Sequence, residues 1–158
     1  MNLRLLTTPL VAATLLLSTL GCAKKDAAAP TATGSYKLDG VLKTCEVTSA
    51  FYAASSGTQA ADDQLTVTLT TTPQPASGQE RVVLTFGKRP GQAPAAYQLA
   101  GFAHLLTTSG VPYNNDVTTL REASSSYSGT FSGTPATTSP GTTPARKVTD
   151  GMFANVRP

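Results

Sequence analysis

The sequence has no tryptophan, a single histidine and only two cysteines among its 158 residues. A typical closed zinc site takes four nitrogen or sulfur ligands, so these residues cannot build one. The sequence also lacks a C-x-x-C pair, an H-E-x-x-H motif and a phosphate-binding G-x-x-x-x-G-K loop. We therefore expect neither a bound metal nor a cofactor.

Charge is scarce as well. Charged residues make up 13% of the sequence, against roughly 25% in an ordinary soluble domain. The net charge is only +3, and the basic residues are scattered along the chain. Nucleic-acid binding draws on clustered positive charge, so we expect no nucleic-acid partner. Polarity comes instead from hydroxyl groups, because 39 residues are Ser or Thr.

No catalytic set can be recognised. His104 lies in the apolar stretch FAHLL, and no serine or cysteine can be argued to lie beside it, so a structural or half-exposed role is expected. The stretch Gly129–Gly133 reads G-T-F-S-G, which is not the G-x-S-x-G of a nucleophile elbow. We expect a protein that is not an enzyme; a hydrolase would need His104 or a pair of acids in a pocket.

Several acidic residues fall at expected loop edges, within Asp62–Asp63, Asn114–Asp116 and at Asp150. Their spacing matches no calcium-binding loop. Asp and Asn are ordinary turn residues, which is the interpretation that we prefer.

The longest apolar run is Leu5–Leu20, and hydroxyl residues and Pro9 interrupt its 16 residues. A spanning helix needs about 20 mostly apolar residues, so this run is too short to cross a membrane. It follows a short positively charged start at Arg4, which is typical of a signal peptide. Gly21 and Cys22 come directly after it.

The end of this segment, Leu20-Gly21-Cys22, resembles the lipobox of bacterial lipoproteins, although Thr19 stands where that family favours leucine. The resemblance implies that residues 1–21 are removed and that Cys22 carries a diacylglyceryl thioether and an amide-linked acyl chain such as palmitate. One acyl chain anchors a protein only marginally, so several are needed. The alternative is a disulfide between Cys22 and Cys45.

The lipobox implies a place in the bacterial cell envelope, with the outer membrane expected and its periplasmic or surface face left open. Residues 22–33 are rich in Ala, Thr and Pro, which is typical of a flexible tether. The expected organisation is a signal peptide (1–21), a lipidated tether (22–33) and one domain (34–158). If lipid occupies Cys22, then Cys45 is left alone, and we expect it to be a buried small hydrophobe.

From Gly34 onward, apolar residues recur with a period of two, which indicates β-strands. Gln64–Thr70 and Arg81–Phe86 show the pattern most clearly, and Asp39–Gly40 is a two-residue hairpin signal. The other strands are expected at Ser35–Leu38, Val41–Val47, Tyr97–Leu106, Val117–Leu120, Tyr127–Phe131 and Arg146–Thr149, with Asp150–Gly151 turning the last of these into Met152–Val156.

This pattern predicts an all-β fold, an antiparallel β-sandwich or open barrel of about eight short strands. Only Phe51–Ala61 would also tolerate a short helix. The pieces SYKLDG, YSGTFSGT and KVTDGMFANV resemble the small all-β domains of uncharacterised Bacteroidota-type lipoproteins. That resemblance implies a β-sandwich and carries no functional residues.

Tyr113 follows Pro112 and precedes Asn114 and Asn115, so we expect its ring to be exposed on a loop where a sugar could stack. Tyr113, Asn114 and Asn115 are the candidate ligand-binding residues. The expected function is a non-enzymatic binding or structural module anchored in the envelope, and the alternative is a carbohydrate- or small-ligand-binding module. The expected partners are the membrane, through lipid, and a glycan or an envelope protein.

Overall fold

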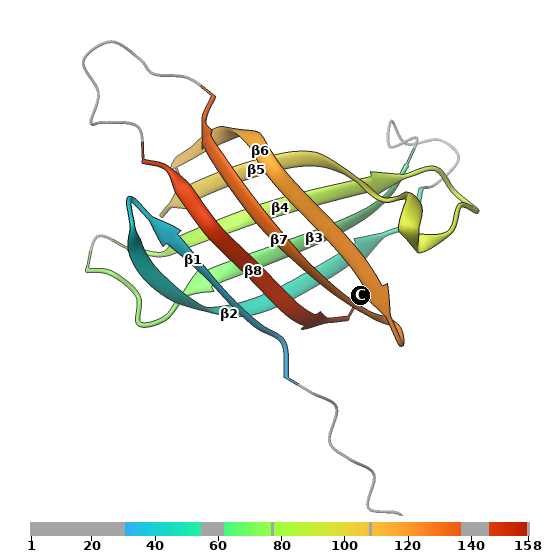
Figure 1. Cartoon of the computed structure of the whole chain (residues 1–158), viewed down its shortest axis with the longest axis horizontal. Helices are drawn as coiled ribbons and strands as arrows, with labels where there is room; N and C mark the ends of the chain where they lie inside the picture. The colour runs from blue at the N-terminus through green and yellow to red at the C-terminus, as the bar shows by residue number, and fades with distance from the viewer. Residues whose placement is uncertain (1–30, 55–61, 77, 108, 137–145, 158) are drawn as a thin grey trace, which may run out of the picture.

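The computed structural model describes residues 31–54, 62–76, 78–107, 109–136 and 146–157. Within these ranges the chain forms eight β-strands and one short 3-10 helix, η1 (Figure 1). The strands are β1 (Thr33–Leu38), β2 (Val41–Tyr52), β3 (Asp63–Thr71), β4 (Glu80–Lys88), β5 (Gln98–Leu106), β6 (Ser109–Ala123), β7 (Ser126–Pro135) and β8 (Val148–Val156), with η1 at Pro94–Ala96.

The eight strands form one closed barrel. Each strand pairs antiparallel with its neighbour in sequence, and β8 then pairs with β1, from Thr33 opposite Ala154 to Leu38 opposite Val148. The prediction of an all-β, antiparallel fold with about eight strands is confirmed. The sheet closes on itself, so neither β1 nor β8 is left with an unpaired edge.

The barrel has two ends. We call the end where β1 begins and β8 finishes the terminal end; the connections β2–β3, β4–β5 and β6–β7 also lie there. The opposite, distal end carries the connections β1–β2, β3–β4, β5–β6 and β7–β8 (Figure 1). This division follows from the strictly antiparallel order of the strands.

One of the two predicted Asp-Gly turns is confirmed and the other is wrong. Asp39 and Gly40 have φ angles of 50° and 81° and join β1 to β2 as a tight hairpin. Asp150 also has a positive φ, but β8 continues through it. There the register against β1 slips between Ser35 and Lys37, so the Asp-Gly pair forms a β-bulge.

β6 is longer than the sequence suggested, because it includes Pro112 and the residues expected as a loop. Its first part, up to Pro112, pairs with β5, and its second part, from Tyr113, pairs with β7. A proline is tolerated in a strand where its missing N–H meets no partner strand. Phe51 and Tyr52 belong to β2 and are not helical, whereas residues 55–61 lie outside the described residues.

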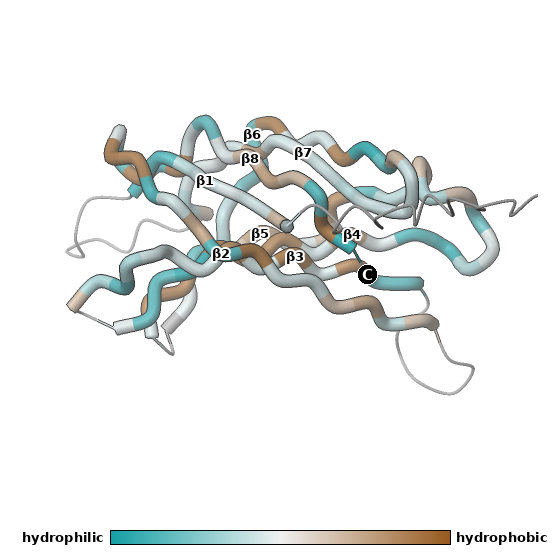
Figure 2. Tube along the Cα trace, turned by 90° about the horizontal axis from the view of Figure 1, so that it is seen from below, coloured by the Kyte–Doolittle hydropathy of each residue, from teal (hydrophilic) through white to brown (hydrophobic). Residues whose placement is uncertain are grey.

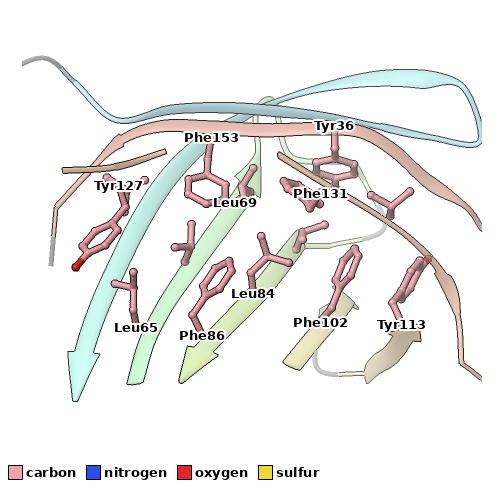
Figure 3. Packing of buried hydrophobic residues seen from close by; sticks show 14 of the residues in the cluster. Tyr36, Leu65, Leu69, Leu84, Phe86, Phe102, Tyr113, Tyr127, Phe131 and Phe153 are labelled. Carbon is pink, nitrogen blue, oxygen red and sulfur yellow. The ribbon is translucent and has the colours of Figure 1, made fainter. Parts of the chain in front are cut away.

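Aromatic rings fill the interior of the barrel (Figure 3). Phe131 lies at their centre, with its ring centroid 5.7 Å from that of Phe102 and 6.5 Å from those of Tyr36 and Phe153. Figure 2 shows hydrophobic and hydrophilic residues alternating in short stretches along the strands. The hydrophobic phase points inward, and a barrel of eight strands is just wide enough to be filled by such side chains.

Glycines give these rings their space. A Cβ atom on Gly129 would lie 2.2 Å from the backbone oxygen of Thr119 and 2.7 Å from the ring of Phe153. A Cβ atom on Gly151 would lie 2.4 Å from the ring of Phe131. The rings and the backbone therefore occupy the volume that a larger residue would need.

We predict that Gly129→Ala lowers the free energy of unfolding by about 1–3 kcal/mol, since the added methyl group forces the backbone to shift. Gly101→Ala is the matched control, because its Cβ would lie 3.7 Å from Thr85, an ordinary contact. We expect the control to change stability by no more than about 0.5 kcal/mol. Urea unfolding measures both values, and equal stabilities of the two variants would contradict the packing described.

Candidate functional site

Five polar side chains gather inside the barrel towards its distal end, one from each of β1 to β5. We call this group the Glu80 cluster: Tyr36, Lys43, Thr71, Glu80 and His104. Their inward position follows from strand register. Tyr36 lies opposite Lys43, and His104 lies opposite the buried Val82. Directly opposite residues point to the same face of a sheet, so the alternating pattern of each strand brings these groups together.

Glu80 is the centre of the cluster, with a side chain that is only 3% exposed. The Tyr36 hydroxyl donates to its Oε1 at 2.8 Å, and His104 Nε2 lies 3.4 Å from the same oxygen. Lys43 Nζ donates to Oε2 at 3.3 Å. The Tyr36 and Thr71 hydroxyls are 3.0 Å apart, so Thr71 can donate to Tyr36 while Tyr36 donates to Glu80.

These contacts determine the protonation of the cluster. Burial by itself would raise the pKa of Glu80, but the hydrogen bond from Tyr36, the charge of Lys43 and the hydrogen bond from His104 bring it below its ordinary value. Burial lowers the pKa of His104, although the hydrogen bond to Glu80 and the charge of Glu80 act to raise it. Burial raises the pKa of Tyr36, and Glu80 adds to that rise. The cluster therefore consists of an ionised carboxylate, a neutral imidazole and a protonated phenol.

The arrangement is suited to holding strands together. Three donors already engage the oxygens of Glu80, and a carboxylate with a lowered pKa is a weak general base. The Cys45 thiol, expected to be buried, packs against the core but is only half-buried, and burial raises its pKa to about 11. A thiol of that kind is protonated at neutral pH and is a poor nucleophile.

His104 could be recognised in the sequence, but its buried partners could not. His104 is buried, in keeping with a structural role, and Glu80 is what makes its burial tolerable. One signal was available, because Glu80 is the first residue of the alternating stretch ERVVLTF and shares the phase of Val82 and Leu84. An acid in the inward phase of a strand needs buried partners.

The expectation of an exposed Tyr113 ring is wrong. Tyr113 lies on β6 and is only 7% exposed, with its ring stacked on that of Phe102 at 5.1 Å. Its hydroxyl donates to the carbonyl oxygen of Arg146, and burial raises its pKa to about 12. Asn114 and Asn115 are exposed on the same strand. The three residues therefore do not form a common surface with an aromatic platform.

A second charged pair lies at the terminal end. Lys88 Nζ donates to Asp63 Oδ2 at 2.6 Å, and the backbone N–H of Ala54 donates to Asp63 Oδ1 at 3.0 Å. The hydrogen bond from Lys88 is the main cause of the lowered pKa of Asp63. Lys88 also lies 5.4 Å from the centre of the Tyr97 ring. Asp63, expected in a turn, is the first residue of β3.

Within the described ranges, no three His, Cys, Asp or Glu side chains are grouped as metal ligands. No helix in the part of the chain that the structure describes is long and apolar enough to cross a membrane. Cys22, the expected lipidation site, lies outside the described residues. Comparison with protein-family models, curated proteins and solved structures gave no significant match.

The lowered pKa values of His104 and Glu80 predict that acid destabilises the fold. Both pKa values are lowered in the folded state, from 6.5 for His104 and 4.5 for Glu80. Each group therefore stabilises the fold fully at a pH above its pKa in the unfolded state. That stabilisation is lost as the pH falls through its lower pKa in the folded state. We expect the free energy of unfolding to decline first below about pH 6.5 and again below about pH 4.5.

Urea unfolding at a series of pH values measures this profile. His104→Gln removes the titrating imidazole, so the variant should lose the first decline and retain the second. A first decline of the same size in the variant would assign it to another group.

Proposed function

We propose that this chain is a lipid-anchored protein of the bacterial cell envelope whose barrel acts as a non-enzymatic binding or structural module. Residues 1–21 are the signal peptide, and Cys22 carries the acyl chains. The run Leu5–Leu20 followed by Gly21 and Cys22 supports the anchor. Several acyl chains replace the spanning segment that this run is too short to provide.

The position at which the chain enters the barrel supports an orientation of the barrel on the membrane. Asn155 Nδ2, near the end of β8, donates to the carbonyl oxygen of Thr31 at 3.5 Å, so the tether reaches the barrel at its terminal end. Thr31 lies nine positions after Cys22, and nine fully extended residue steps span at most about 32 Å. The terminal end therefore faces the membrane, and the distal end with its four connections faces the aqueous side.

A non-enzymatic role is supported by the state of the Glu80 cluster. Its carboxylate accepts from Tyr36, Lys43 and His104, while burial raises the pKa of its phenol and lowers the pKa of its imidazole. A buried network with satisfied hydrogen bonds fixes strand positions and leaves little basicity for catalysis.

Substitution of the lipidated cysteine tests the anchor. Cells that express the full chain are labelled with palmitate, and their proteins are partitioned into a detergent phase. We expect the Cys22→Ser variant to lose both the label and the detergent partitioning. Cys45→Ser is the matched control and should retain both. Wild-type protein without label, or loss of label in the Cys45→Ser variant, would refute the proposed anchor.

A second candidate function, binding of a small ligand at the distal end, is favoured by two exposed valines. Val41 lies opposite Leu38 and Val111 lies opposite His104, so both have the inward phase. They are nevertheless 61% and 40% exposed, because they lie at the rim. Lys43 follows Val41 on the same face of β2 and is partly exposed. Apolar rim residues beside a cation suit a small amphipathic anion.

The fluorescent anion anilinonaphthalene sulfonate is a direct probe of this rim. We expect saturable binding that Val41→Asp weakens by about threefold, because an exposed charge interaction is worth up to roughly 1 kcal/mol. Val117→Asp is the matched control, since Val117 is 57% exposed and lies opposite the outward-facing Ser132. Equal weakening in both variants would rule out a site at the distal rim.

A further inference from the structure

Two adjacent aromatic residues are exposed where β2 ends. Phe51 is 45% exposed and Tyr52 is 62% exposed. The stretch Ala50–Ala54, which contains them, has no charged residue. The eight other phenylalanine and tyrosine rings of the described residues are all buried in the core, so this pair departs from the general pattern.

This pair lies at the end of the barrel where the tether enters. The Ser49 hydroxyl donates to the carbonyl oxygen of Arg157, the last described residue. Phe51 follows Ser49 by two strand positions, or about 7 Å. Asn155, two residues before Arg157, donates to Thr31 at 3.5 Å. The aromatic pair, the end of β8 and the tether therefore share the terminal end.

We propose that Phe51 and Tyr52 insert into the headgroup region of the membrane that holds the lipid on Cys22, so that the barrel docks on the bilayer by its terminal end. This inference rests on the proposed lipid anchor. The length of the tether supports it, because the nine residue steps from Cys22 to Thr31 keep the terminal end within about 32 Å of the acylated cysteine. Aromatic side chains with an apolar body and, in tyrosine, a polar tip are enriched at membrane interfaces.

The charges at this end are compatible with that partner. Exposed side chains there comprise three cations and two anions: Arg89, Arg121, Arg157, Asp62 and Glu122. Among the described residues at this end, Lys88 and Asp63 carry the other charges and neutralise each other in an ion pair. A small positive balance favours approach to anionic lipid headgroups.

The absence of tryptophan makes a direct test possible, since a single introduced indole is the only one in the protein. The acylated full chain carrying Tyr52→Trp is reconstituted on vesicles of phosphatidylethanolamine and phosphatidylglycerol. We expect its emission to shift to the blue on the vesicles and to be quenched when the acyl chains are brominated. Val41→Trp is the matched control at the distal end, because Val41 is 61% exposed. Its emission should stay unshifted and unquenched.

Flotation of the vesicles separates failure of the anchor from failure of docking. If the protein does not float with the vesicles, the lipid anchor is refuted, and the docking that depends on it is refuted as well. Protein that floats with an unshifted Tyr52→Trp emission refutes docking alone. A blue shift without quenching by brominated lipid would show that the ring is buried against protein, for example a second copy of the chain, and would also overturn the inference. Quenching in both variants would refute the orientation.

Discussion

The pairing of β1 with β8 is the constraint on which the rest of the structure depends. It removes the two edge strands that an open eight-stranded sheet would expose. It also encloses the inward-facing side chains of all eight strands in one core. Tyr36 on β1 can reach Glu80 on β4 only because the sheet curves round and closes. The same closure brings Phe131 on β7 against Tyr36 and Phe153, so polar and apolar packing share one geometric cause.

Much of the fold could be predicted from the sequence, because a half-buried antiparallel strand imposes a period of two on its residues. The strand β3 could be predicted from the alternation of Leu65, Val67 and Leu69 with polar residues. The first hairpin could be predicted from Asp39–Gly40. Closure could not be predicted, since the alternation of one strand does not say which strands pair at the ends. Asp150 was misjudged because a positive φ serves a β-bulge as well as a hairpin turn.

The candidate site was harder to predict than the fold. Tyr113 lies between proline and asparagines, and local composition indicated a loop, but its place opposite Pro135 on β7 turns its ring into the core. Glu80 was missed because a lone acid after a turn usually faces solvent. Its burial is favourable only with Tyr36 and Lys43, which are far away in sequence, so no local pattern contains that information.

The two ends of the barrel have different characters, which links the fold to the proposed function. Exposed aromatics and the start of β1 share the terminal end, while the Glu80 cluster and the exposed Val41 and Val111 lie at the distal end. Nuclear Overhauser effects between β1 and β8 in isotopically labelled protein test this account most directly. We predict backbone contacts between Gly34 and Phe153 and slow amide exchange throughout β1. Rapid exchange in β1 without such contacts, while β3 and β4 stay protected, would contradict closure and everything derived from it.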